Sequence, residues 1–334
     1  MSNGKNGRKA LSKLLTTFAI ILVFMFLECI LYGTQENGTI GDTNNSSNKE
    51  EVSNVQSAEG ELTLIMIDVG QADSFLLVQD GKTALIDCGT RSTGEDVVEY
   101  LKSQGITRLD YVFGTHPHDD HMGGMYDVIT NFEIGKIIIP ETKLGEITSN
   151  WYMKLMQEFK NGLYDVEYPK LGEVYNLGGA TMKIIGPISE PDGNSNNYSI
   201  VLKVSFGDMD VIMTGDAETV VEKEILESGE NIDAEILKVG HHGSDTSSSE
   251  EFLDAITPEY ALISAKIGNM YKHPVESTME KLENRDIEVY RTDENGTVVV
   301  TITTDDISFS CNPGDYLSGT ELEERYAKWK VMLQ

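Results

Sequence analysis

A stretch rich in histidine and aspartate directly follows an apolar run, and this pairing limits the fold more than any other feature of the sequence. Residues 109–114 are apolar enough to form a buried strand, and residues 115–124 read Thr-His-Pro-His-Asp-Asp-His-Met-Gly-Gly. The cluster should therefore lie on the loop at the C-terminal end of this strand. In α/β folds such loops carry reactive side chains, because the sheet fixes their position.

The spacing within this loop predicts a metal site. His116 and His118 are two residues apart and can converge on one ion, and Asp120 and His121 follow closely enough to reach a second. Imidazole with carboxylate ligands suits zinc, manganese or iron, and two ions roughly 3.5–4 Å apart can activate water and neutralise a developing oxyanion. A polar surface loop that happens to be rich in histidine is the alternative, and it leaves the spacing unexplained.

Composition limits the partners that the chain can bind. The 334 residues have a net charge of −29, and 40% of them are hydrophobic, which is enough to bury a core. No Lys/Arg-rich run lies in the body of the chain, so we expect no non-specific adhesion to nucleic acid, and bound cations would have to attract a phosphate substrate. The three cysteines, at positions 29, 88 and 311, do not indicate a disulfide framework.

The N-terminal segment is predicted to direct the rest of the chain out of the cytoplasm. Four basic residues precede an apolar stretch over about residues 14–32, which is long enough to span a bilayer. We expect an uncleaved membrane anchor at residues 1–33, with a cleaved signal peptide as the alternative. Lipidation at Cys29 is disfavoured because Glu28 stands where such sites carry a small residue. The protein should therefore be extracytoplasmic, either membrane-anchored or secreted.

The remaining chain divides into a linker, a folded domain and a tail. Residues 34–60 are polar and should form a disordered linker, residues 61–312 should form the folded domain, and residues 313–334 a helical tail. Strands are expected at 62–68, 74–78, 83–87, 109–114, 136–140, 181–185, 200–205, 210–214, 234–239, 260–264, 287–290, 297–303 and 307–311. Helices are expected at 95–104, 122–130, 150–160, 217–227, 249–256 and 274–284. This α/β pattern fits two packed sheets with helices on the outer faces.

Three further polar clusters follow predicted strands. Asp216 is placed to bridge two metal ions, and His273 precedes a proline. The adjacent His241 and His242 point in different directions, so at most one is a direct ligand, and the other would hydrogen-bond a substrate oxygen or act as an acid. Taken singly, these residues are more often turn or surface residues. All six histidines of the chain nevertheless fall in these clusters and the first one, which scattered structural histidines would not do.

These segments carry a resemblance to a known family. The run from His116 to His121 is similar to the His-x-His-x-Asp-His signature of the metallo-β-lactamase superfamily. The segments at 68–74, 85–89, 197–199, 214–216, 238–244 and 271–274 resemble, in that order, the extracellular hydrolase domain of ComEC-like competence proteins. The resemblance covers about residues 62–311. It implies an αββα sandwich of two mixed sheets with helices on the outer faces, and a site of one or two divalent ions.

The resemblance also implies roles for individual side chains. Six residues would be metal ligands: His116, His118, Asp120, His121, Asp216 and His241. The first two would bind one ion and the next two the second, with Asp216 bridging, while His242 and His273 would line the substrate side. Asp73 and Asp87 would accept hydrogen bonds from metal-bound imidazoles and fix the ring orientation. The residues placed just outside the ligands are Asn197, Lys238 and Ser244.

Two departures from the family pattern affect these expectations. Many superfamily members place a metal-binding histidine before the Thr-Gly-Asp strand, where residues 195–199 of this chain read Ser-Asn-Asn-Tyr-Ser. One fewer imidazole favours a harder ion, so manganese is expected as well as zinc. The family's Gly-Gln-Gly-Asp is here Gly-Gln-Ala-Asp, a small change if Ala72 can adopt the same backbone geometry.

The expected function is an extracytoplasmic hydrolase that uses metal-activated water on a phosphodiester or a short nucleic acid. Asp120 is expected to accept the proton of the attacking water, and His242 or His273 to steady the leaving group. Hydrolysis of an ester, thioester or lactam at the same site is one alternative, and a non-catalytic module that keeps its metal for structure is another. The membrane is an expected partner through residues 1–33, and no protein partner is inferred. One apolar segment cannot form a DNA-translocating pore, so DNA uptake is not expected.

Overall fold

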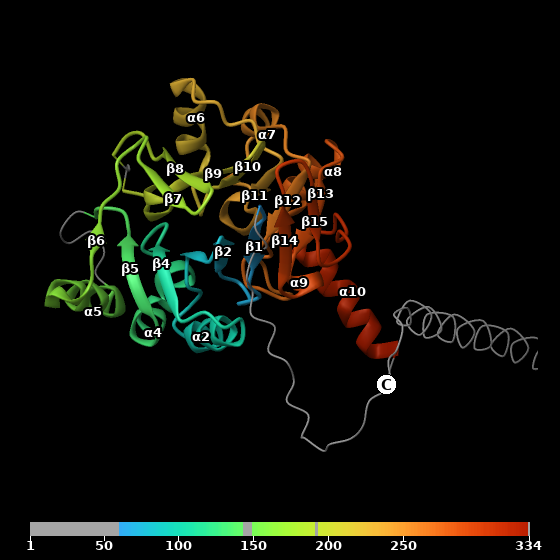
Figure 1. Cartoon of the computed structure of the whole chain (residues 1–334). Helices are drawn as coiled ribbons and strands as arrows, with labels where there is room; N and C mark the ends of the chain where they lie inside the picture. The colour runs from blue at the N-terminus through green and yellow to red at the C-terminus, as the bar shows by residue number, and fades with distance from the viewer. Residues whose placement is uncertain (1–59, 143–148, 191–192, 333–334) are drawn as a thin grey trace, which may run out of the picture. The chain divides into compact units, whose positions relative to one another are not determined.

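The computed structural model describes residues 60–142, 149–190 and 193–332, which form two stacked sheets with helices on both outer faces (Figure 1). The first sheet has eight strands in the order β15-β14-β1-β2-β3-β4-β5-β6, and the second has seven in the order β13-β12-β11-β10-β9-β8-β7. The predicted αββα sandwich of mixed sheets is confirmed. The expected anchor at residues 1–33, Cys29 and the linker up to residue 59 lie outside the described residues.

The strands are short and are divided almost evenly between the sheets. The first sheet consists of β1 (Leu62–Met66), β2 (Phe75–Gln79), β3 (Lys82–Ile86), β4 (Arg108–Phe113), β5 (Glu133–Ile138), β6 (Val166–Glu167), β14 (Val298–Ile302) and β15 (Ile307–Phe309). The second consists of β7 (Val174–Leu177), β8 (Ala180–Gly186), β9 (Val201–Phe206), β10 (Met209–Met213), β11 (Ile236–Lys238), β12 (Tyr260–Ile263) and β13 (Glu288–Arg291).

Helices cover each sheet from outside. Those on the first sheet are α2 (Gly94–Ser103), α4 (Met125–Asn131) and α5 (Asn150–Glu158), and those on the second are α6 (Thr219–Ser228), α7 (Glu250–Ile256) and α8 (Glu276–Glu283). The shorter elements are α3 (Asp119–Met122), α9 (Thr292–Asn295), the 3₁₀ turns η2 (Ser195–Tyr198) and η3 (Gly240–Gly243), and the π-turn η1 (Phe159–Leu163). The C-terminal helix is α10 (Gly319–Met332). Within the described ranges, no helix is long and apolar enough to cross a membrane.

Strand direction brings the polar loops together. In the first sheet β3, β4, β5 and β6 run parallel, and in the second sheet β10, β11, β12 and β13 do so. Parallel neighbours end at the same edge of a sheet, so the loops that follow β3 and β4 lie together, as do those that follow β10, β11 and β12. The other pairs are antiparallel, and β1 lies between β2 and β14.

Hydrophobic side chains alternate between the inner core and the two outer layers. In β1, Leu62, Leu64 and Met66 face the second sheet, while Ile65 faces the helices that cover the first. All five residues of β1 are buried, because both faces of the strand are covered. This burial explains why the strand reads as a continuous apolar run rather than as an alternating one.

The helix expected at residues 122–130 is interrupted. Two helices, α3 and α4, take its place, with Gly123 and Gly124 between them. A Cβ atom on Gly123 would lie 2.1 Å from the carbonyl oxygen of Asp119, and one on Gly124 would lie 2.2 Å from that of Cys88. Both positions therefore require glycine. The edge strands β6 and β7 were not expected, since they are only two and four residues long.

The C-terminal helix packs only through its first turn. Leu322 is buried, but the expected apolar face continues with Tyr326 and Trp329, which are about half exposed at 43% and 52%. Ion pairs of Arg325 with Glu294 of α9 and with Asp315 hold the second turn of the helix. Leu333 lies outside the described residues.

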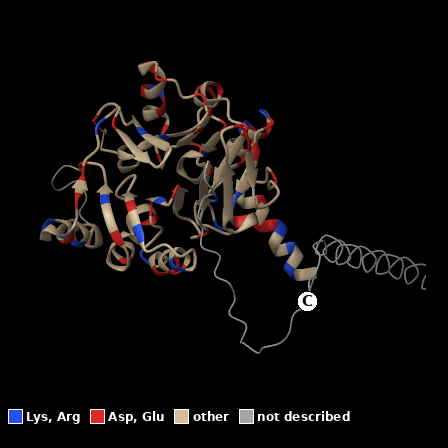
Figure 2. Cartoon of the chain, in the orientation of Figure 1, with Lys and Arg blue, Asp and Glu red and all other residues tan. Residues whose placement is uncertain are grey.

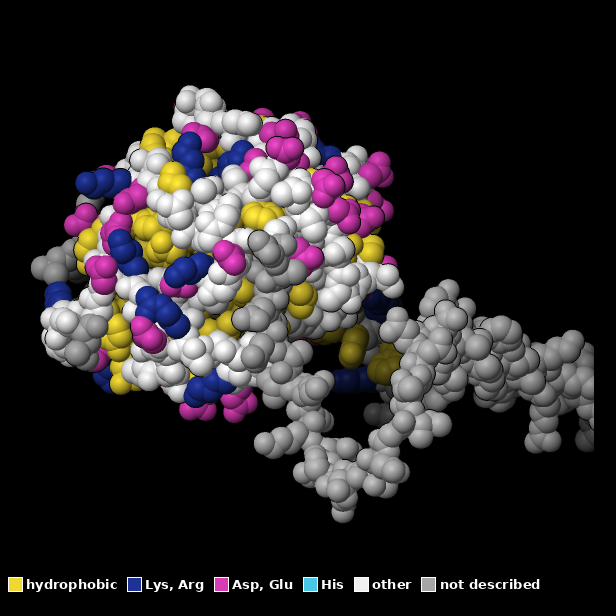
Figure 3. Space-filling model, viewed as in Figure 1, with side chains coloured by type: hydrophobic (Ala, Val, Ile, Leu, Met, Phe, Trp, Pro, Cys, Tyr) yellow, Lys and Arg dark blue, Asp and Glu magenta, His cyan; other side chains and the backbone are white. Residues whose placement is uncertain are grey.

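Charged side chains of both signs are interspersed over the surface. Figure 2 shows acidic and basic residues distributed over the elements of both layers. The face drawn in Figure 3 shows Lys and Arg next to Asp and Glu, with no continuous basic surface among the described atoms in that view.

Candidate metal centre

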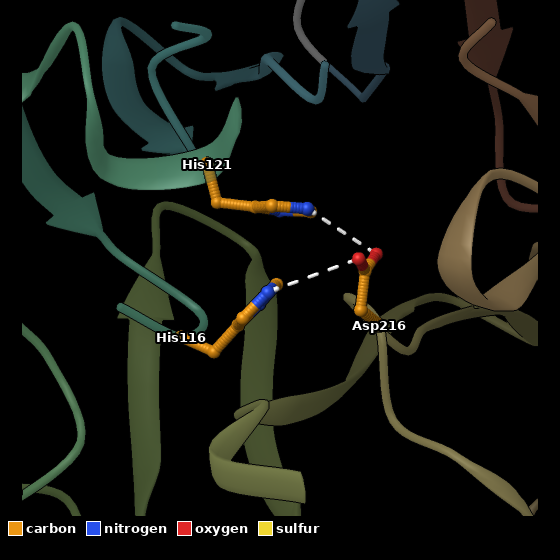
Figure 4. A group of neighbouring side chains, drawn as sticks. All are labelled: His116, His121 and Asp216. Atoms are coloured by element: carbon orange, nitrogen blue, oxygen red, sulfur yellow. Dashed lines mark ion pairs between the residues drawn. The ribbon is translucent and has the colours of Figure 1, made fainter. Parts of the chain in front are cut away.

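The polar clusters predicted from the sequence meet at one edge of the sandwich. His116 and His121 lie on the segment that follows β4, and Asp216 follows β10 in the other sheet (Figure 4). Nε2 of His116 lies 3.8 Å from Oδ2 of Asp216, and Nε2 of His121 lies 3.2 Å from its Oδ1. Residues about one hundred positions apart therefore face one another, and all three side chains are buried.

His121 is fixed from behind by a carboxylate. Its Nδ1 lies 2.7 Å from Oδ2 of Asp87. Thr115 holds the same carboxylate with two hydrogen bonds of 2.8 Å: its hydroxyl donates to Oδ2 of Asp87, and its backbone N–H donates to Oδ1. When Nδ1–H donates to Asp87, Nε2 is the nitrogen left to bind an ion, and it faces Asp216. Metal-binding histidines are usually oriented by such a hydrogen bond.

Several buried polar atoms at this edge lack a hydrogen-bond partner. They are Nε2 of His121, Oδ1 of Asp216, Nε2 of His242 and Oδ1 of Asp73. Nε2 of His242 lies 3.9 Å from the same Asp216 oxygen that His121 approaches. Buried polar atoms are normally paired, and lone pairs that converge without a donor are what a divalent ion would satisfy. The residues present therefore fit a metal site.

Three groups of side chains have ligand atoms within 4.8 Å of one another, and His121 belongs to all of them. The first adds His116 and Asp216, and the second adds Asp120 and His242. The third adds Asp73 and Asp87, but Nδ1 of His121 is already engaged by Asp87. The first two groups are therefore the ones that can offer a free imidazole nitrogen to an ion.

The adjacent histidines after β11 both lie near Asp216 but differ in burial. His242, expected on the substrate side, is buried; its Nδ1 lies 2.9 Å from the Ser264 carbonyl oxygen and its Nε2 3.6 Å from Oδ2 of Asp120. His241, expected to be the ligand, has its Nε2 3.6 Å from Oδ2 of Asp216; its side chain is 23% exposed, and it belongs to none of the three groups. Both residues have positive φ, 49° and 54°, so the backbone turns between their side chains. Both rings therefore lie within reach of Asp216, and only His242 shares a group of three ligand atoms with His121.

His118 and His273 lie beside these groups rather than within them. Nδ1 of His118 lies 3.0 Å from Nε2 of His116, close enough for both rings to approach one ion. The ring of His273 lies 5.5 Å from that of His241 and 5.6 Å from that of Tyr271. Burial and the nearby His241 lower the pKa of His273 to about 4, so its imidazole is neutral at neutral pH.

Residues 67–265 match the family described as the metallo-beta-lactamase superfamily. The chain belongs to the metallo-β-lactamase superfamily. ComE operon protein 3 of Bacillus subtilis (strain 168) is 33% identical over 260 residues, which cover 72% of this chain and 33% of that protein. Competence protein ComA of Neisseria gonorrhoeae is 30% identical over 71% of this chain and 32% of its own length. The chain thus spans about a third of these curated relatives.

A solved structure supports the same fold. CmlA, a diiron β-hydroxylase from Streptomyces venezuelae, aligns with a TM-score of 0.51 at 14% identity, over 74% of this chain and 55% of that one. At this low identity the structural match shows the fold alone. The family match and the competence relatives confirm the resemblance that the sequence motifs indicate.

In this superfamily member, carboxylates outnumber cations around the candidate ligands. Asp73, Asp87 and Asp216 are buried, and Nζ of the buried Lys238 lies 2.5 Å from Oδ2 of Asp73 and 3.7 Å from Oδ1 of Asp216. Burial acts to lower the pKa of His242, but Asp216 and Asp73 raise it to about 10. The excess of negative charge therefore favours a cation in this space, whether a proton or a metal ion.

Two residues that support the candidate ligands were missed by the sequence analysis. Oγ of Ser199 lies 3.3 Å from Nδ1 of His116 and accepts a hydrogen bond from the Asp216 backbone N–H at 3.0 Å. The Thr115 hydroxyl contacts Asp87 and lies 3.2 Å from the same His116 nitrogen. Ser199 lies in the Asn-Tyr-Ser motif, which is the signal that could have identified it.

The other residues expected around the ligands have supporting positions. Oδ1 of Asn197 accepts a hydrogen bond from the Glu218 backbone N–H at 3.3 Å. The Ser244 backbone N–H donates to the His241 carbonyl at 2.9 Å, and its hydroxyl lies 3.1 Å from that of Thr246. These contacts hold the segment before β9 and the loops after β10 and β11 rather than the candidate ligand atoms themselves.

Proposed function

We propose that this protein is an extracytoplasmic metal-dependent hydrolase that cleaves phosphodiester bonds. The observation that carries the proposal is the convergence of three buried atoms that have no hydrogen-bond partner, Nε2 of His121, Nε2 of His242 and Oδ1 of Asp216. Membership of the metallo-β-lactamase superfamily supports metal-dependent hydrolysis in general. The phosphodiester substrate and the location are our own inferences.

The candidate ligands divide into two sets. His116, His118 and Asp216 would hold one ion, and Asp120, His121 and His242 would hold a second, with Asp216 between them. Zinc and manganese both suit ligands of this kind, and the share of carboxylates raises the affinity for manganese. When bound, the ions would activate water and neutralise negative charge on a phosphate oxygen.

The protein's own groups would orient the substrate and carry the proton. The Asp120 side chain is 30% exposed, the most accessible carboxylate among the candidate ligands, so it is placed to accept a proton from water. The neutral His273 is buried beside the partly exposed His241, with their ring centres 5.5 Å apart. There they would hydrogen-bond the substrate and steady its leaving group.

A carboxylate-rich site in an acidic protein favours small phosphodiesters or short oligonucleotides over long DNA. The net charge of −29 disfavours a long polyanion bound through many backbone contacts. We do not propose a role in DNA uptake, although the relatives are competence proteins, because the match covers only about a third of their length.

The reaction is tested with manganese-loaded protein on bis(p-nitrophenyl) phosphate, single-stranded DNA and nitrocefin. We expect turnover of one or both phosphodiesters, abolished by His118→Ala. Activity on nitrocefin alone would replace the proposal with lactam or ester hydrolysis. No activity on any substrate, with metal bound, would indicate an accessory module that keeps its ion for structure.

Location is tested separately. We propose that residues 1–33 attach the protein to the membrane and place the sandwich outside the cytoplasm. Fractionation of cells that express the full chain should recover it with membranes, and protease added to intact spheroplasts should digest it. A variant that lacks residues 1–33 should be recovered in the cytoplasmic fraction. Protection of the full chain from the protease would contradict the proposal.

A further inference from the structure

A cavity of about 720 Å³ outside the metal centre is lined mainly by residues of α4 and α5. These two helices lie on the outer face of the first sheet (Figure 1). Its lining includes Arg91, Gly123, Tyr126, Trp151 and Lys154. This volume falls within the range of about 300–1,000 Å³ that is typical of small-molecule sites. None of the candidate metal ligands lines the cavity, so it is a separate feature of the fold.

One short helix connects this cavity to the metal centre. Asp120 and His121 of α3 belong to a candidate ligand group, whereas the preceding residue, Asp119, pairs with Arg91 on the cavity wall. Oδ1 of Asp119 lies 2.5 Å from Nε of Arg91, and Gly123, directly after α3, lines the cavity. A molecule held in the cavity would therefore lie against the segment that carries Asp120 and His121.

The side chains of the cavity combine aromatic surface, positive charge and hydrogen-bond acceptors. Tyr126 is 51% exposed and Trp151 is partly buried, so both can offer ring surface to a ligand. Lys154 is exposed and has no ion-pair partner in the described part of the chain. Asp127 and Glu158 add carboxylates to the lining.

This combination suits a nucleotide better than a simpler ligand. A nucleobase stacks on aromatic rings, its phosphate contacts a lysine or arginine, and base or sugar N–H and O–H groups donate to carboxylates. Inorganic phosphate would use only the cations and would be repelled by Asp127 and Glu158. A purely apolar ligand would make no use of Lys154 or of the two carboxylates.

We propose that this cavity binds one nucleotide of an oligonucleotide whose neighbouring phosphodiester lies at the metal centre. The inference deepens the proposed function and rests on it for the reaction, but not for binding. Stacking at one cavity would let a protein of net charge −29 hold a short oligonucleotide without an extended basic surface.

Binding can be measured without catalysis, because the chain has only two tryptophans, Trp151 and Trp329. In Trp329→Phe protein treated with EDTA, a thymidine tetranucleotide should quench the emission of Trp151 in a saturable way. Lys154→Ala in that background should raise the apparent Kd at least about threefold, whereas Lys160→Ala, which removes an exposed charge next to α5 but outside the cavity, should not. Trp151→Phe, which keeps Trp329, should show no quenching. Inorganic phosphate should leave the emission unchanged.

Kinetics of the metal-loaded enzyme provide the second readout. Trp151→Ala should raise KM for the tetranucleotide roughly tenfold and leave kcat/KM for bis(p-nitrophenyl) phosphate unchanged, because the small substrate does not reach the cavity. Lys154→Ala serves as a second variant if Trp151→Ala unfolds.

The outcomes separate this inference from the proposed function. Trp151 emission that does not respond to the tetranucleotide, or equal effects of the variants on both substrates, would overturn the cavity inference while phosphodiester hydrolysis stands. Saturable quenching by the tetranucleotide, without hydrolysis of any phosphodiester, would support the cavity and overturn the proposed function.

Discussion

Oδ2 of Asp87 lies 2.7 Å from Nδ1 of His121, and this contact links the loop after β3 to the loop after β4. The same carboxylate accepts two hydrogen bonds from Thr115, and these fix the position of Asp87 relative to the His121 ring. The direction of the His121 lone pair therefore depends on a residue that would not itself touch an ion.

Asp87→Ala should weaken metal binding without removing a ligand. We expect the affinity for manganese or zinc to fall roughly 10- to 100-fold, because His121 loses the acceptor that fixes its ring. Isothermal titration of metal into protein treated with chelator measures the change. Glu99→Ala, which removes an exposed carboxylate from α2, is the matched control. An unchanged affinity in Asp87→Ala would show that His121 does not bind the ion.

The two adjacent histidines after β11 should differ in their effect on metal content. His242→Ala should purify with less bound metal, because it removes a buried nitrogen of a candidate ligand group. His241→Ala should retain its metal and lose turnover, because His241 is partly exposed on the substrate side. Elemental analysis of the two purified variants distinguishes them. The reverse result would restore the sequence-based assignment of His241 as the ligand.

Ser199→Ala should loosen the first candidate set of ligands. The change removes the contact with His116 Nδ1 and the acceptor of the Asp216 backbone N–H. A hydrogen bond of this kind contributes about 0.5–1.5 kcal/mol net, so manganese affinity should fall by a factor of roughly two to ten. Electron paramagnetic resonance of free manganese during titration measures this directly. Equal affinity in the variant and the wild type would contradict the role.

Removal of the ion should destabilise the folded domain. The carboxylates of Asp73, Asp87 and Asp216 are buried together, and a bound cation offsets their mutual repulsion. At a free metal concentration of 100 times Kd, binding to the native state adds about 2.7 kcal/mol. Thermal unfolding with manganese and with EDTA should therefore give a higher Tm for the former. Asp216→Asn should reduce this difference, and a difference of the same size in that variant would contradict the assigned ligand.

Gly319→Ala should disturb the loop that carries His273. A Cβ at this position would lie 2.3 Å from the His273 carbonyl oxygen, so the tail or the loop must move. We expect a loss of about 1–3 kcal/mol in the free energy of unfolding, as for overpacking elsewhere, together with reduced turnover. Urea denaturation measures the first effect. Thr320→Ala, at an exposed neighbouring position, should change neither quantity.

Much of the fold could be predicted from the sequence, because the apolar runs in the sequence are the segments that the packed sheets bury. The apolar runs correspond to the central strands, and the loops that follow β4, β10, β11 and β12 carry the histidines and Asp216 as expected. The interruption at Gly123 and Gly124 could not be predicted, because it depends on carbonyl groups of Asp119 and Cys88 that approach only in the folded chain.

The different burial of the His241 and His242 rings depends on backbone conformation. Two consecutive non-glycine residues with positive φ are uncommon, and the residue pattern of the sequence does not predict them. Ser199 was missed for a related reason. Its hydroxyl matters only because the turn η2 brings it beside His116, which lies 83 positions earlier in the chain.

The pairing of β1 with β14 has a consequence for how the sandwich can be combined with other segments. Leu62, where the first strand begins, lies opposite Ile302, where its partner ends. The start of β1 and the end of β14 thus lie side by side, with most of the sandwich between them in sequence. Neighbouring entry and exit points of this kind tolerate insertion of a domain into a larger polypeptide. Such a domain can be joined to other segments at one end, or be inserted within a longer protein, without a change in its internal geometry.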